Sequence, residues 1–131
     1  MDTLEKRDAI FYQNLALLYY AMGMTDKRFV VEEKKVIIGI IKKYWSLRDL
    51  DLDVENIVYS KLKTLVDSEM SSKAAFKQFQ QYYESHTSLY PIVIRRQLIE
   101  DVYAIASAYA NRNKSELVLF SQIMHLFFPS K

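Results

Sequence analysis

The sequence of 131 residues contains no cysteine, only two glycines and only two prolines. The lack of cysteine excludes disulfides, zinc sites built on thiolates and cysteine nucleophiles, and it fits a reducing compartment. The scarcity of glycine and proline disfavours β-hairpin and β-sandwich folds, which need many turn-forming residues. Long helices joined by short connections are favoured instead.

Long apolar runs are also missing. Charged residues interrupt every apolar stretch well before the roughly 20 residues that a membrane span requires. The N-terminal segment is rich in charge and lacks an apolar centre, so we expect no signal peptide. Together these features predict a cytoplasmic protein that folds as a single domain over residues 1–131.

No excess of one charge dominates the chain, because 18 basic residues face 16 acidic ones and the net charge is +2. A dedicated nucleic-acid-binding protein usually has a more basic and more clustered surface, so we expect no nucleic-acid partner. Weak nucleic-acid binding through the lysines of the second predicted helix is kept as one functional alternative. The sequence has no glycine-rich phosphate loop, nucleophile elbow or His-Glu-x-x-His helix. We therefore expect no enzymatic activity.

Apolar residues, in contrast, are abundant. They make up half of the sequence, and 14% of all residues are aromatic. They recur at steps of three and four, which is the pattern of amphipathic helices. The sequence therefore predicts one compact all-α bundle of six or seven helices, with the second or the fifth helix near its centre. The expected helices cover residues 3–22, 30–46, 54–66, 72–84, 91–110 and 114–128.

The sixth predicted helix is apolar on most of its circumference. Only Ser121, Gln122 and His125 keep its solvent side polar. Such a helix is either deeply buried or in contact with another chain. The fourth helix carries aromatic residues on one face, and a protein partner is expected to meet these aromatics or the sixth helix. The predicted interaction surface consists of Phe76, Phe79, Tyr83, Phe127 and Phe128.

Two parts of the sequence resemble each other. Residues 17–21 read Leu-Leu-Tyr-Tyr-Ala, and residues 106–110 read Ala-Ser-Ala-Tyr-Ala. In each case a polar turn, a glutamate and a second apolar helix follow; the glutamates are Glu33 and Glu116. The pattern predicts two pseudo-repeated helical hairpins. The alternative is that any two amphipathic hairpins rich in tyrosine and alanine look this similar.

Acidic residues flank the start of the second predicted helix, at Asp26 and Glu33. Carboxylates in this place stabilise a helix because they complement its dipole and accept hydrogen bonds from free amides. The alternative is a divalent-cation site, since calcium and magnesium take clustered oxygen ligands. Lys27 and Arg28 lie between the two carboxylates and already supply positive charge. Apart from such a cation, no cofactor is expected.

Residues 15–45 resemble the first helical hairpin of the TerB-like, tellurite-resistance family. Asp26, Phe29 and Glu33 match an aspartate, an aliphatic position and a glutamate of the family pattern. Glu116 matches the glutamate in a second, diverged hairpin. The resemblance implies an all-helical TerB-like domain with a role in bacterial stress response, in metal or tellurite tolerance, or in protein complexes near the membrane.

The function expected from these features is a non-enzymatic protein-interaction or scaffold module with a protein partner of unknown identity. A divalent-cation-binding protein that uses the acidic turn before the second helix is the alternative. Weak nucleic-acid binding comes third.

Overall fold

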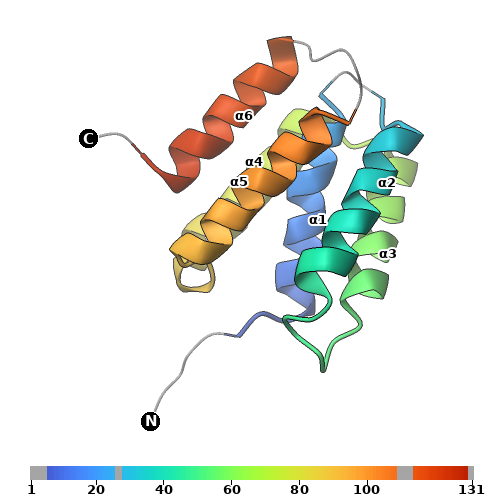
Figure 1. Cartoon of the computed structure of the whole chain (residues 1–131). Coiled ribbons are helices and arrows are strands. Elements are labelled where there is room, and N and C mark those ends of the chain that lie inside the picture. Colours follow the sequence, from blue (N-terminus) through green and yellow to red (C-terminus); the bar gives the residue numbers. More distant parts are fainter. Residues whose placement is uncertain (1–5, 26–27, 109–113, 130–131) are drawn as a thin grey trace.

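The computed structural model describes residues 6–25, 28–108 and 114–129. These residues form a compact all-α bundle of six α-helices without strands, which confirms the predicted fold class (Figure 1). The helices are α1 (Ala9–Gly23), α2 (Val31–Ile40), α3 (Val54–Ser68), α4 (Ser72–Ser85), α5 (Ile92–Ala106) and α6 (Lys114–Phe127). None of the helices in the described part of the chain is both long enough and apolar enough to cross a membrane.

The ends of several helices follow from local capping. The carboxylate of Asp8 accepts a hydrogen bond from the Phe11 amide at 3.0 Å, so the first helix begins at residue 9 rather than near residue 3. Asp53 and Ser71 cap α3 and α4 in the same way, at the starts of the two helices expected from residues 54 and 72. The fifth helix ends at Ala106, earlier than predicted. The end predicted for that helix, at residue 110, lies outside the described residues.

The helical path of α2 continues as a single π-helical turn, η1 (Ile41–Trp45). The Ser46 amide donates to the Ile41 carbonyl at 2.9 Å, five residues back instead of four. Trp45 lies at the end of this wider turn and is fully buried. A short 3-10 turn, η2 (Thr87–Leu89), leads into α5.

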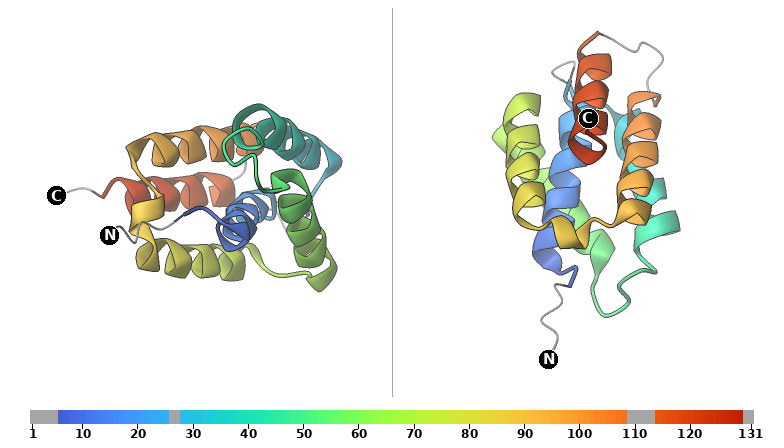
Figure 2. Two further views of the ribbon diagram at one scale, coloured as in Figure 1. Left: turned by 90° about the horizontal axis from the view of Figure 1, so that it is seen from below. Right: turned by 90° about the vertical axis from the view of Figure 1, so that its left-hand side faces the viewer.

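The central helix is α1, which contacts α3, α4, α5 and α6 (Figure 2). Twelve of its 15 residues are buried. The expectation that the second or the fifth helix lies at the centre is therefore wrong. The physical reason is that apolar or aromatic residues occupy every side of α1 from residue 15 to residue 23, and such a helix is most stable when other helices enclose it. In contrast, α2 keeps Lys34 and Lys35 in solvent.

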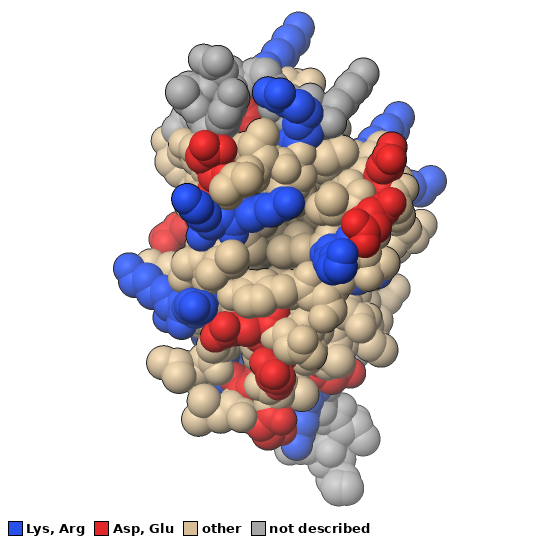
Figure 3. All heavy atoms as spheres, turned by 90° about the vertical axis from the view of Figure 1, so that its right-hand side faces the viewer, with Lys and Arg blue, Asp and Glu red and all other residues tan. Residues whose placement is uncertain are grey.

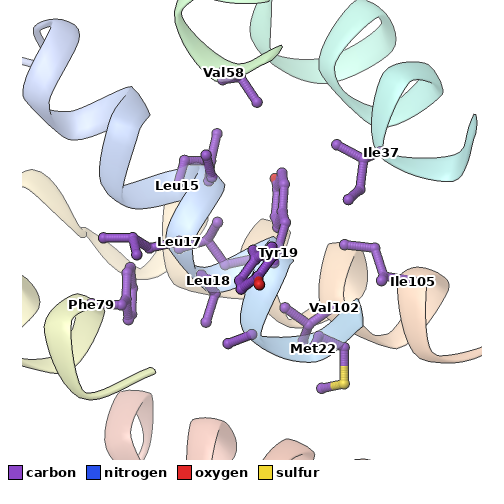
Figure 4. Close-up of a cluster of buried hydrophobic side chains, with 14 of the residues drawn as sticks. Leu15, Leu17, Leu18, Tyr19, Met22, Ile37, Val58, Phe79, Val102 and Ile105 are labelled. Carbon is purple, nitrogen blue, oxygen red and sulfur yellow. The ribbon is translucent and has the colours of Figure 1, made fainter. Parts of the chain in front are cut away.

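One apolar core joins both ends of the chain and includes Trp45 as well as Leu98. Figure 4 shows how side chains of α1 meet those of the surrounding helices. The labelled residues are Leu15, Leu17, Leu18, Tyr19 and Met22 of α1, Ile37 of α2, Val58 of α3, Phe79 of α4, and Val102 and Ile105 of α5.

The last helix, α6, lies between α4 and α5 and in front of α1 (Figure 2, right). It packs on α5 and, less extensively, on α1. Arg95 of α5 fixes its C-terminal end, because the guanidinium donates to the Phe127 carbonyl at 2.7 Å. The same guanidinium lies 5.0 Å from the ring centroid of Phe128. Helix α6 is thus held along one side and at one end.

Candidate functional site

A groove runs between α4 and α6. Its first part has a volume of about 580 Å³ and lies near the N-terminal ends of both helices. A second hollow of about 430 Å³ adjoins it, and the two share Phe76 and Gln122. We call these two hollows together the α4–α6 groove. It is lined by Thr25, Ser72, Lys73, Phe76, Gln80, Lys114, Ser115, Val118, Leu119, Ser121, Gln122, His125 and Leu126.

The groove exists because α6 buries only one of its faces. The buried positions of α6 are spaced by three and four residues, which is one helical face; they are Glu116, Leu119, Ile123 and Phe127. Val118 points to the groove side and is 49% exposed, while Leu117 and Met124 are 58% and 39% exposed. Apolar side chains on an exposed helix surface favour contact with another molecule, because covering them removes apolar area from water.

The groove has a positive end. Lys73 and Lys114 line it there and are exposed. Both α4 and α6 begin at this end. The first turn of α4 has no acidic residue, so the positive end of its helix dipole adds to the lysines, whereas Glu116 lies in the first turn of α6. Among the described residues that line the groove, none is acidic. Glu84, one turn beyond the lining residue Gln80, accepts a hydrogen bond from it at 3.4 Å.

Of the five residues of the predicted interaction surface, the structure buries three and leaves two half-buried. Phe79 and Phe127 are fully buried, and their ring centroids lie 6.0 Å apart. Tyr83 is also buried, and its ring centroid lies 5.0 Å from that of Phe127. The prediction that these three residues form a surface is therefore wrong, because the aromatic stripe of α4 faces inward and packs against the end of α6. Phe76 is half-buried and lines the groove, and Phe128 is half-buried beside α5.

The structure describes one of the two residues of the predicted cation site. Asp26 lies outside the described residues. Glu33 is 2% exposed, and its carboxylate accepts a hydrogen bond from the Val30 amide at 2.9 Å, which caps the start of α2. In the described ranges, no group of three or more acidic or histidine side chains is placed to hold a metal ion. Cation binding at this turn stays a prediction.

The two glutamates of the predicted repeat occupy similar places. Glu33 lies in the first turn of α2 and Glu116 in the first turn of α6. Both are buried, with 2% and 4% of their surface exposed. The second helix of each predicted hairpin therefore begins with an enclosed carboxylate. The pseudo-repeat itself stays a prediction.

A buried carboxylate at Asp101 joins three parts of the bundle. It accepts hydrogen bonds from the Tyr19 hydroxyl at 2.5 Å, the Trp45 indole at 3.0 Å and the Gln97 amide at 2.7 Å. Burial raises the pKa of Asp101, although these hydrogen bonds act to lower it. Burial and the neighbouring Asp101 carboxylate raise the pKa of Tyr19 well above its ordinary value. The network links α1, η1 and α5 and lies outside the α4–α6 groove.

Sequence reasoning missed this network, although a signal was present. Asp101 lies three residues after Leu98 and four before Ile105, so a carboxylate stands on the apolar stripe of α5. A charged residue in that position needs hydrogen-bond donors from the neighbouring helices. The sequence alone does not reveal that Tyr19 and Trp45 supply them.

The basic face predicted for nucleic-acid binding lies on α2 and η1. Lys34, Lys35, Lys42 and Lys43 are all exposed. Figure 3 shows the side of the molecule formed by α2 and α3, where acidic and basic side chains both surround a stretch without charged residues. A smaller hollow of about 280 Å³ between α2 and α3 includes Lys63 and Asp67. Their charged groups are paired at 3.3 Å, so this side has mixed charge.

Comparison of the chain with protein-family models, with curated proteins and with solved structures finds no match. The TerB-like resemblance stays a prediction.

Proposed function

We propose that this protein is a non-enzymatic protein-interaction module that binds a protein partner in the α4–α6 groove. The observation that carries this proposal is the one-sided packing of α6, which exposes 49% of Val118 at the edge of an apolar groove. Leu117 and Met124 extend the apolar surface of α6. Exposed apolar side chains beside a groove favour contact with a protein partner, which would remove them from water.

The cysteine-free sequence supports a cytoplasmic setting, because cytosolic proteins rarely depend on disulfides. The TerB-like resemblance supports a role in bacterial stress response or tellurite resistance. In that setting the module is a scaffold that brings a second protein into a complex.

The test compares two substitutions that each place a carboxylate on an exposed apolar position. Val118→Asp changes the groove, and Leu50→Asp changes a residue that is 78% exposed in the connection between η1 and α3. The tagged variants are used to capture proteins from an extract of the cells that naturally express this chain. We expect Val118→Asp to lose a partner that the unsubstituted protein and Leu50→Asp both retain.

Both variants are expected to melt within a few degrees of the unsubstituted protein, because surface substitutions usually change the free energy of unfolding by about 0.5 kcal/mol or less. Retention of every captured protein by a folded Val118→Asp variant contradicts the proposed function.

A further inference from the structure

We propose that the α4–α6 groove binds an amphipathic α-helix whose carboxylates lie against Lys73 and Lys114. This inference rests on the proposed function and adds the chemistry of the partner. Recognition of an amphipathic helix by an apolar groove is a recurrent mode of peptide binding. Three features of the groove favour it: its length, its apolar floor and its charge.

The length and the floor suit a helix. α4 and α6 have 14 residues each and are therefore about 21 Å long. The two hollows are neighbours along these helices, since Phe76 and Gln122 line both. Val118 and Leu119 supply apolar surface in the first hollow, and Leu126 supplies it in the second. An apolar stripe on a helix of about four turns can cover both hollows.

The charge selects an acidic helix. In the described part of the chain, neither Lys73 nor Lys114 forms an ion pair with a carboxylate, and both line the groove. The helix dipole of α4, whose first turn has no acidic residue, adds positive potential at the same end. A basic helix is repelled there, whereas an acidic one can form two ion pairs without breaking any ion pair found among the described residues.

The hollow between α2 and α3 shows by contrast why the choice falls on the α4–α6 groove. Lys34 and Lys63 line that hollow too, but Asp67 also lines it and is paired with Lys63 at 3.3 Å. An acidic ligand there has to compete with a carboxylate of the protein itself. The α4–α6 groove has no such competitor among its described lining residues.

The experiment uses synthetic helical peptides of about four turns. Three peptides share one apolar stripe and differ only in the residues at its edges, which are glutamate, glutamine or lysine. A fourth keeps the glutamates but has a scrambled order that destroys the stripe. Binding to the full chain is measured by fluorescence anisotropy, and NMR chemical shifts locate the bound peptide.

We expect the glutamate peptide to bind about tenfold more tightly than the lysine peptide, because two exposed ion pairs replace two repulsions. Its affinity should fall as salt is added, the scrambled peptide should not bind, and the shifted resonances should belong to α4 and α6. Failure of the glutamate peptide to bind overturns the inference. So does equal affinity for the glutamate and lysine peptides, or a chemical-shift map centred on another face.

A charge exchange tests the two lysines directly. The double variant Lys73→Glu/Lys114→Glu should prefer the lysine peptide. The matched variant Lys42→Glu/Lys43→Glu reverses two exposed charges on η1 and should keep the preference of the unsubstituted protein. An equal loss of preference in both variants means that net charge alone is responsible, and this overturns the inference. Displacement of the glutamate peptide by a single-stranded oligonucleotide assigns the lysines to nucleic acid and overturns it as well.

The two proposals fail in different ways. If Val118→Asp releases the cellular partner while the lysine peptide binds as tightly as the glutamate peptide, the protein-interaction function stands and the acidic helix is wrong. If Val118→Asp keeps every partner, the proposed function is wrong whatever the peptides do.

Discussion

Helices α1 and α6 are both apolar, but the bundle encloses α1 and covers only one face of α6. Twelve of the 15 residues of α1 are buried, against four of the 14 residues of α6. The difference arises from position, since α1 contacts four other helices whereas α6 packs on α5 and α1 and meets α4 only near its C-terminal end, through Phe127 (Figure 2). An apolar helix in a sequence therefore indicates surface that must be covered, and the fold decides whether the same chain covers it.

The largest expected difference between the two helices is in the cost of removing a leucine side chain. Leu18→Ala in α1 opens a cavity at a residue with no exposed surface and should lower the free energy of unfolding by about 2–5 kcal/mol. Leu117→Ala in α6 removes a side chain that is 58% exposed and should change it by about 0.5 kcal/mol or less. Urea denaturation of both variants measures the two values. Equal losses would mean that α6 is as enclosed as α1.

A second expected difference concerns two tyrosine hydroxyls, one on α1 and one near the end of α6. Tyr19→Phe removes a hydrogen bond to the buried carboxylate of Asp101 and should destabilise the protein by about 1–3 kcal/mol. Tyr90 packs against Phe127, and its buried hydroxyl has no hydrogen-bond partner among the described residues.

Tyr90→Phe should therefore leave stability unchanged or raise it, because a buried unpaired hydroxyl is unfavourable. Thermal melting of the two variants checks both expectations. A loss of stability in Tyr90→Phe as large as that in Tyr19→Phe would contradict the difference between the two environments.

A smaller effect should appear in the pH dependence of stability. Burial raises the pKa of Asp101 in the folded protein above its ordinary value of 3.8. The folded state therefore holds more protons than the unfolded state between these two pKa values, so stability falls as pH rises through that window. Each unit of the pKa difference corresponds to about 1.4 kcal/mol.

Asp101→Asn should remove this pH-dependent contribution. The amide oxygen of the asparagine can still accept hydrogen bonds from Tyr19 and Trp45, and its amide nitrogen can donate to Gln97 once the side-chain amide of Gln97 rotates. The stability of the unsubstituted protein relative to Asp101→Asn should fall as the pH rises above the ordinary pKa of 3.8. The measurement is a series of urea denaturation curves at increasing pH. A relative stability that rises with pH would mean that hydrogen bonding outweighs burial at this carboxylate.

Local features of the fold could be predicted from the sequence, because they depend on residues close together in the chain. The start of α3 after Asp53 and of α4 after Ser71 follows from their side chains, which bind the free amides of the first turn. The helical periodicity also predicts the all-α bundle. The π-helical turn at η1 has no comparable signal in the sequence; Trp45 at its end donates a hydrogen bond to Asp101, which lies far away in the chain.

Features that depend on which helices meet could not be predicted. Apolar periodicity shows that a helix has a buried side but not how many other helices will cover it, so the central place of α1 follows only from the fold. The aromatic stripe of α4 is visible in the sequence, but its inward direction follows from the contact of Phe79 with Phe127. The α4–α6 groove brings Lys73 and Lys114 to one place from positions far apart in the chain.

Site-specific photo-crosslinking tests most directly whether the exposed surface of α6 is covered by a partner. A photoreactive phenylalanine derivative replaces Val118 in one sample and Leu50 in another, and both are irradiated in an extract of the cells that naturally express the protein. We predict a crosslinked protein partner at Val118 and none at Leu50, although Leu50 is the more exposed of the two. Equal crosslinking at both positions, or none at Val118, would contradict the assignment of α6 as the binding helix.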